Sequence, residues 1–239
     1  MELIEIYLVR HGQTMLNKMN RVQGWVDSPL TKEGIEIAEL CGLGLSEINF
    51  DVAYSSDFMR AIKTTQIILN QHKNKEIIHH YHEGLRELAF GDFDGGYETE
   101  RKRACSKFFL KEDNLTLLNE KLKSKEIVPR QMMNATYEMD QSGYAESYDQ
   151  VEERAAKAIK EIIEKAKKNN QKKILVVSHG VTISAILEHF PGEKLDKVSD
   201  MKNASVSLLT YKDSEVVVEE AVSMKYVETG RELRNKLKI

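Results

Sequence analysis

The first twelve residues constrain the fold more than any other stretch of this chain. Residues 3–9 read LIEIYLV, in which only Glu5 is polar, and Arg10, His11 and Gly12 follow directly. A short apolar run ended by glycine is typical of a buried strand. Ligands bind beyond the carboxyl ends of strands in open α/β sheets, so Arg10 and His11 are candidates for an anion-binding and catalytic pair. Taken alone, they fit an incidental polar loop equally well.

Strand and helix patterns then alternate. We expect Thr31 to cap a helix that runs to about residue 47, and we expect strands at 52–54 and 75–81. The helix between those strands is expected to use Ser55, Ser56 and Asp57 as capping residues. This β-α-β alternation predicts an α/β fold, a three-layer αβα sandwich around a mostly parallel central sheet.

The stretch at about 97–145 has a different character. It is rich in charge, and it contains one proline and no glycine before Gly143. Such a composition predicts a helical insertion, either a surface hairpin without a role or a cap over the site. After it we expect an amphipathic helix at 148–168, a strand at 174–177, a helix to about His189, a hairpin over 205–222 and a loose helical tail. One domain is expected to span residues 1–239.

Composition limits the classes of function. The net charge is −3, from 35 basic and 38 acidic residues, which gives no sign of a nucleic-acid or membrane partner. Cys41 and Cys105 are too far apart in sequence for a zinc motif and too few for a disulfide framework. The N-terminal residues lack the pattern of a signal peptide, and no apolar run approaches the ~20 residues of a membrane span. We therefore expect a cytoplasmic protein.

A second junction, far down the chain, resembles the first. Ser178, His179 and Gly180 follow the apolar run 174–177. If the two strands are neighbours, both imidazoles face one pocket. Arg60, at the start of a helix, and Glu87, in the loop after the third strand, lie between the two junctions in sequence. Two arginines, two histidines and a carboxylate suit the chemistry of phosphate esters.

At this point the chain resembles the histidine phosphatase superfamily, which includes the cofactor-dependent phosphoglycerate mutases. The resemblance rests on sequence blocks that occur in the order of that family. They are Arg10-His11-Gly12 with Thr14 and Asn17, the loop from Gln23-Gly24-Trp25 to Thr31 with Gly34, Tyr54-Ser55-Ser56 with Arg60-Ala61 and Thr64, Leu85-Arg86-Glu87 with Phe90-Gly91 and Gly95, Ser178-His179-Gly180, and Asn203-Ala204-Ser205-Val206.

The resemblance implies a role for each residue. His11 would attack phosphorus as a neutral nucleophile, with one ring nitrogen held as a donor by a backbone carbonyl. Glu87 would protonate the leaving oxygen and then activate water. The phosphoryl oxygens would be bound by Arg10, Arg60 and His179, and the rest of the pocket would be formed by Asn17, Gln23, Gly24, Ser178 and Gly180. The resemblance requires no metal.

The residues after Glu87 separate two branches of the family. They read LAFGDFDG, which resembles the phosphatase pattern R-E-x-x-F-G-x-x-E/D-G. The E-R-H-Y-G and W-R-R segments of the mutases are absent, since Trp25 is the only tryptophan. We expect a phosphatase that needs no cofactor and acts on a small phosphorylated metabolite. A mutase primed by 2,3-bisphosphoglycerate is the alternative, and a non-catalytic phospho-ligand module is a third. A homodimer is suggested only by the family.

Other interpretations remain open for single residues. Glu87 could pair with Arg86, and His179 could be a hydrogen-bonded core residue. Ser178 could suggest a serine nucleophile, although the G-x-S-x-G elbow is missing. A compact group of histidines fits a solvated strand end better than a metal site; it comprises His79, His80 and His82. The Arg101-Lys102-Arg103 run is expected on a solvated helix face, or else near a second anionic group of the substrate.

Overall fold

The sheet of this protein is mixed but mostly parallel. The computed structural model describes residues 3–73, 76–193 and 201–237. Within them, one six-stranded sheet has the order β3-β2-β4-β1-β5-β6, in which β5 and β6 run antiparallel to their neighbours. The strands are β1 (Ile4–Arg10), β2 (Val52–Ser55), β3 (His79–Tyr81), β4 (Lys173–Ser178), β5 (Val206–Lys212) and β6 (Glu215–Ser223).

The two strands that end in histidine junctions are neighbours. β1 and β4 pair in parallel, with Val9 beside Val177 and Arg10 beside Ser178. The chain therefore leaves both strands at the same edge of the sheet, and His11 and His179 follow at equivalent positions. This adjacency was the condition on which the sequence argument for a shared pocket depended.

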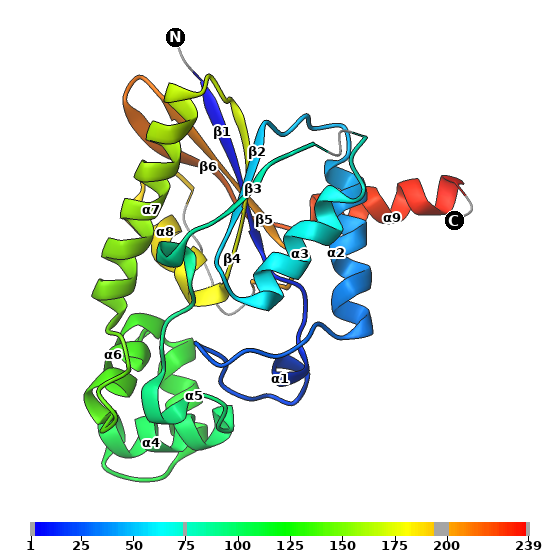
Figure 1. The fold of residues 1–239 in the computed structure, drawn as a ribbon. Helices are drawn as coiled ribbons and strands as arrows, with labels where there is room; N and C mark the ends of the chain where they lie inside the picture. The colour runs from blue at the N-terminus through cyan, green and yellow to red at the C-terminus, as the bar shows by residue number, and fades with distance from the viewer. Residues whose placement is uncertain (1–2, 74–75, 194–200, 238–239) are drawn as a thin grey trace.

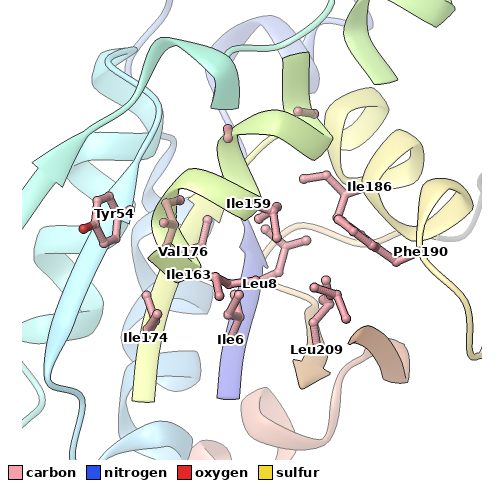
Figure 2. Close-up of a cluster of buried hydrophobic side chains, with 14 of the residues drawn as sticks. Ile6, Leu8, Tyr54, Ile159, Ile163, Ile174, Val176, Ile186, Phe190 and Leu209 are labelled. Carbon is pink, nitrogen blue, oxygen red and sulfur yellow. The ribbon is translucent and has the colours of Figure 1, made fainter. Parts of the chain in front are cut away.

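Helices cover both faces of the sheet, which confirms the three-layer prediction (Figure 1). The helices α2 (Lys32–Leu45), α3 (Met59–Leu69) and α9 (Lys225–Leu237) lie on one face, and α7 (Tyr148–Lys168) and α8 (Gly180–His189) on the other. Alternate residues of β1 supply the two cores. Ile6 and Leu8 point toward α7 and α8, where they pack with Ile159 and Ile186 (Figure 2). None of the helices in the described part of the chain is long and apolar enough to cross a membrane.

The predicted insertion forms a helical cap. It contains α4 (Glu98–Leu110), α5 (Leu115–Lys123) and α6 (Pro129–Met139), which gather at the end of the molecule toward which β1 runs (Figure 1). These helices enclose a small core of their own, with Cys105, Leu118 and Met132 buried. The short α1 (Met15–Lys18) and single 3₁₀ turns at Glu83–Leu85 and Gly91–Phe93 complete the description.

Two predictions about the first half of the chain were wrong in detail. The third strand is shorter than expected, covering only His79–Tyr81, and Lys75 lies outside the described residues. The N-cap of α3 is Phe58, which makes no side-chain cap bond. Ser56 and Asp57 do not cap this helix because their side chains bond to His179 and Arg86, which are distant in sequence.

The C-terminal helix α9 is packed against α2 and is not loose, as the sequence had suggested. Val227 on α9 is buried, and glycines lie where the two helices cross. A Cβ atom at Gly44 would come within 1.8 Å of the Tyr226 carbonyl oxygen, and one at Gly230 within 1.8 Å of the Leu40 carbonyl oxygen. The contact between α2 and α9 therefore depends on the absence of side chains at these positions.

Gly44→Ala should destabilise the protein. Alanine in a helix is ordinarily more favourable than glycine by about 0.5–1 kcal/mol, but here its methyl group must push α9 away, at a cost of about 1–3 kcal/mol. Urea unfolding should show a lower free energy of unfolding for the variant. Lys32→Ala, at an exposed position of α2, is the control and should stay within about 0.5 kcal/mol of the wild type. A stabilised Gly44→Ala protein would contradict the close packing.

Candidate active site

The two junction histidines meet at the carboxyl edge of the sheet. The ring centroids of His11 and His179 lie 5.1 Å apart. Both side chains are buried, with 3% and 0% of their surface exposed. The parallel register of β1 and β4 thus brings together two imidazoles that are far apart in sequence.

The hydrogen bonds of His11 set its tautomer. Its Nδ1 lies 2.7 Å from the Gly12 carbonyl oxygen, which can only accept, so Nδ1 carries the proton. Nε2 makes no hydrogen bond to any described residue and is left with a free lone pair. Burial lowers the pKa of His11 well below 6.5, and the nearby Arg60 and Arg10 lower it further. The structure shows the expected backbone carbonyl at one ring nitrogen of His11, and the nucleophilic role of this residue stays a prediction.

Arg10 has an unsatisfied donor beside His11. One terminal nitrogen donates to the Met201 carbonyl oxygen, but Nε is buried and has no partner among the described residues. Gly180 lies directly against this guanidinium, since a Cβ atom there would be 3.6 Å from Arg10 Cζ. A buried N–H group without an acceptor is rare, because leaving it unpaired costs about 1–3 kcal/mol. An anionic ligand would satisfy it.

Glu87 is fixed at the N-terminus of α8. Its two carboxylate oxygens accept hydrogen bonds from the backbone N–H groups of Val181 and Thr182, at 3.2 and 3.1 Å, and from the Thr182 hydroxyl. Arg86 does not pair with Glu87, as the sequence had left open. It binds Asp57 through two bonds of 2.7 and 2.5 Å. The Glu87 carboxylate therefore has no cationic side chain paired to it among the described residues.

Arg60 and His179 are bonded to each other. Arg60 Nε donates to His179 Nδ1 at 3.1 Å, so the proton of His179 sits on Nε2, which lies 2.6 Å from the Ser56 hydroxyl. The remaining Arg60 bonds go to the carbonyl oxygens of Gly24 and Val26 and to the Asp27 carboxylate. Burial lowers the pKa of His179 well below 6.5, with Arg60 as the next cause. Their predicted role on phosphoryl oxygens requires exchanging these bonds for the ligand, and it stays a prediction.

A pocket of about 380 Å³ opens beside these residues. Of the predicted site residues, the structure places five on its walls: Arg10, His11, Asn17, Gln23 and Glu87. The other five do not line it: Gly24, Arg60, Ser178, His179 and Gly180. The remaining wall residues were not assigned to the site from sequence: Gln13, Asn20, Arg21, Val22, Phe90, Glu98 and Asn203.

Two of the predicted pocket residues already donate hydrogen bonds to other parts of the protein. The Gly24 N–H donates to the Asp94 carboxylate at 2.6 Å, and the Ser178 hydroxyl donates to the Leu85 carbonyl oxygen at 2.8 Å. Ser178 is completely buried, so nothing supports a serine nucleophile. By contrast, Asn17 and Gln23 bond to each other on the pocket wall, with Asn17 Nδ2 lying 3.3 Å from Gln23 Oε1.

Phe90 and Asn203 are missed wall residues that stand in blocks which the sequence analysis had noted. Asn203 lies shortly before β5, and its amide donates to the His11 carbonyl oxygen at 2.9 Å. It therefore fixes the backbone of the nucleophile candidate.

The sequence analysis left open the surroundings of the histidine group and of the Arg101-Lys102-Arg103 run. His79 bonds to Ser55, and His82 bonds to Glu161. Within the described ranges, no group of three or more His, Cys, Asp or Glu residues could hold a metal ion. The predicted solvated face is wrong for Arg101, which is 4% exposed and binds both oxygens of Glu98. Cys41 and Cys105 are free and buried.

His11→Gln should flatten the pH dependence of stability. Unfolded histidine titrates near pH 6.5, whereas buried His11 binds its proton only well below that pH. Between these values the unfolded state holds more protons. The free energy of unfolding therefore falls as the pH drops below 6.5, by up to about 1.4 kcal/mol per pH unit for each such histidine, and is unaffected above it. Urea unfolding at pH 7.5, 6.5 and 5.5 should show a shallower fall in the variant. Parallel curves would contradict a buried neutral His11.

Known proteins resemble this chain over most of its length. The model of the histidine phosphatase superfamily (branch 1) matches residues 6–117 and 110–223. The structure of phosphoglycerate mutase from Bacillus anthracis is 33% identical, with a TM-score of 0.86 and 96% of this chain and 97% of that chain covered. A metal-independent phosphoserine phosphatase of Arabidopsis thaliana is 28% identical over 91% of this chain and 81% of that protein.

A third relative matches over a shorter region. The 2,3-bisphosphoglycerate-dependent phosphoglycerate mutase of Methanococcus vannielii is 36% identical over 93 residues, which are 39% of this chain and 40% of that protein. The similar proteins thus include both a phosphatase and mutases. The chain itself belongs to the histidine phosphatase superfamily.

Proposed function

We propose that this protein is a metal-independent phosphatase that hydrolyses small phosphate monoesters through a phosphohistidine on His11. One observation carries the proposal. The free Nε2 of a neutral His11 stands in the same pocket as Glu87 and the unpaired Nε of Arg10. This arrangement offers a nucleophile, a donor for phosphoryl oxygens and a group that can transfer a proton.

In the first step, His11 Nε2 attacks phosphorus and the bond from phosphorus to the ester oxygen breaks. Glu87 gives a proton to that oxygen, so the leaving group departs as an alcohol. The buried Arg10 guanidinium, and Arg60 once it releases the loop carbonyls, stabilise charge on the phosphoryl oxygens. A cationic site that is shielded from water makes these interactions stronger than they would be in solvent.

In the second step, water attacks the phosphohistidine. Glu87 takes one proton from the water, the bond from phosphorus to His11 breaks, and inorganic phosphate leaves. His11 returns to its neutral form with Nδ1 still bonded to Gly12. The four donor groups around the Glu87 carboxylate hold it in one position for both transfers.

A cofactor-dependent mutase is the second candidate, supported by the similarity to such enzymes. A mutase must bind a bisphosphate and keep water from the phosphohistidine. The sequence lacks the W-R-R segment, and Arg101 of the cap is engaged with Glu98 and does not line the pocket. These observations favour hydrolysis.

Loss of His11 or Glu87 should separate two contributions to catalysis. His11→Ala should lower kcat/KM for 4-nitrophenyl phosphate at least 10³-fold, because no covalent intermediate can form. Glu87→Gln should lower hydrolysis of an alkyl phosphate about 10²–10⁴-fold but that of the nitrophenyl ester much less, since nitrophenolate leaves without a proton. Assays run with and without EDTA should agree.

The exposed residues His80 and Glu100 provide matched controls. His80→Ala and Glu100→Gln should retain wild-type turnover. An active His11→Ala enzyme, or turnover lost on chelation, would remove the proposed mechanism. A wild-type protein that binds phosphate esters but hydrolyses none would point to the binding-module alternative.

The mutase alternative has a direct test. With 3-phosphoglycerate and catalytic 2,3-bisphosphoglycerate, a phosphatase should release free phosphate faster than it forms 2-phosphoglycerate. Enzymatic detection of 2-phosphoglycerate, run beside a phosphate assay on the same reaction, measures both rates. The opposite ranking would assign the chain to the mutases.

A further inference from the structure

The loop that carries Glu87 is held in place by side chains. Residues 86–90 follow a single 3₁₀ turn and belong to no helix or strand, so no regular ladder satisfies their backbone groups. Instead, the four carbonyl oxygens of residues 84–87 all accept hydrogen bonds from side chains that are distant in sequence. The donors are Trp25, Arg154, Ser178 and Thr182.

Arg154 on α7 makes the largest contribution to this loop. Its Nη1 donates to the carbonyl oxygens of Gly84 and Arg86, at 3.0 and 2.8 Å, and its Nη2 donates to that of Glu87 at 3.0 Å. The other two N–H groups bind the two carboxylate oxygens of Glu146, at 2.7 and 2.8 Å. A guanidinium has five N–H donors, so every donor of Arg154 has an acceptor within the protein. Its task is therefore internal to the fold.

Glu146 holds the same loop from the side of the cap. Its Oε2 accepts a hydrogen bond from the Ala89 N–H at 3.0 Å, and its own N–H donates to the Ala89 carbonyl oxygen at 2.9 Å. The ion pair is partly buried, with 22% of the Arg154 side chain and 18% of the Glu146 side chain exposed. Bidentate pairing of this kind fixes direction as well as distance. The backbone is thus held both before and after Glu87.

The Glu87 carboxylate depends on the position of this backbone. It accepts hydrogen bonds from the N–H groups of Val181 and Thr182 at the start of α8. The helices α7 and α8 belong to one hydrophobic core, so the clamp and these two amides share a common base. A general acid must lie within hydrogen-bond reach of the atom that it protonates, and a misplacement of about 1 Å can cost about 10²-fold in rate.

We propose that Arg154 is a positioning residue for the proton transfer by Glu87, and that Glu146 holds Arg154 in the required orientation. Arg154 fixes the backbone from residue 84 to residue 87, so that the Glu87 carboxylate meets the start of α8 in one orientation. Arg154 acts through Glu87 and does not touch the reacting atoms. The inference rests on the proposed function, because it requires Glu87 to act as the acid.

Two esters of similar size separate this role from a general loss of stability. Benzyl phosphate needs a proton on its leaving oxygen, whereas 4-nitrophenyl phosphate does not. Arg154→Gln should lower kcat/KM for benzyl phosphate at least tenfold more than for the nitrophenyl ester, mainly through kcat. Glu146→Gln should change this ratio at least threefold in the same direction. Arg154→Lys keeps the charge but not the planar fork, so it should recover only part of the ratio.

The effect should disappear when Glu87 is removed. In the Glu87→Gln background, adding Arg154→Gln should leave the ratio of the two esters unchanged within about twofold, since no acid remains to be positioned. Lys157→Gln removes an exposed cation of α7, and Ile162→Val weakens the buried face of the same helix. Both controls should keep the wild-type ratio, which does not depend on the folded fraction. An unchanged ratio in Arg154→Gln, or an equal change in the controls or the Glu87→Gln background, would overturn the proposal.

Amide hydrogen exchange tests the clamp without any turnover. The Glu87 carboxylate accepts hydrogen bonds from the N–H groups of Val181 and Thr182, which should slow their exchange. In Arg154→Gln both should exchange at least tenfold faster by NMR, whereas Lys157→Gln should leave them unchanged. If the wild type hydrolyses no ester but this protection is lost, the phosphatase proposal fails and the positioning of Glu87 stands. If Glu87→Gln changes the ester ratio but Arg154→Gln changes neither the ratio nor the exchange, the positioning role is wrong and the phosphatase stands.

Discussion

The parallel pairing of β1 with β4 is the constraint on which the site depends. It sets Arg10 beside Ser178, so that the chain turns away from both strands at one edge and places His11 next to His179. The other residues of the candidate site are held by the chain segments that follow these two strands. Gly180 opens the helix that holds Glu87, and Asn203 fixes the His11 backbone from the approach to β5. A shift of one residue in that register would move the imidazoles to opposite faces.

Burial affects the ionisation of the histidines and arginines of the candidate site. Burial lowers the pKa of both His11 and His179, and the nearby Arg60 lowers both further. Burying Arg60 and Arg10 would cost free energy if their N–H groups had no hydrogen-bond acceptors. Arg60 donates to loop carbonyls and to Asp27, while Arg10 Nε has no acceptor in the part of the chain that the structure describes. In the reaction that we propose, a phosphoryl dianion would accept a hydrogen bond from this unsatisfied donor.

Sequence alone predicted the three layers, because they follow from the alternation of strand and helix patterns. It left the pairing of β1 with β4 as a condition, and the resemblance to the family implied only that one ring nitrogen of His11 would meet a backbone carbonyl. It could not place Arg21 and Glu98 on the same pocket wall. Their segments are joined by the isolated bridge between Arg21 and Tyr97 and by the bond from the Glu98 N–H to the Asn20 carbonyl oxygen, and such irregular pairing leaves no periodic signal. The expected capping by Ser56 and Asp57 failed for a related reason, since their partners His179 and Arg86 are brought near only by the completed sheet. These long-range hydrogen bonds override the local preference of serine and aspartate for capping a helix.

The cap has a hydrophobic core separate from those that bind the sheet to its helices. The residues proposed to act on phosphorus are anchored to β1 and to α8, whereas Glu98 begins the cap itself. Because the cap has a core of its own, a change at its buried positions can reshape this end of the molecule while the strands that hold Arg10 and His11 keep their packing.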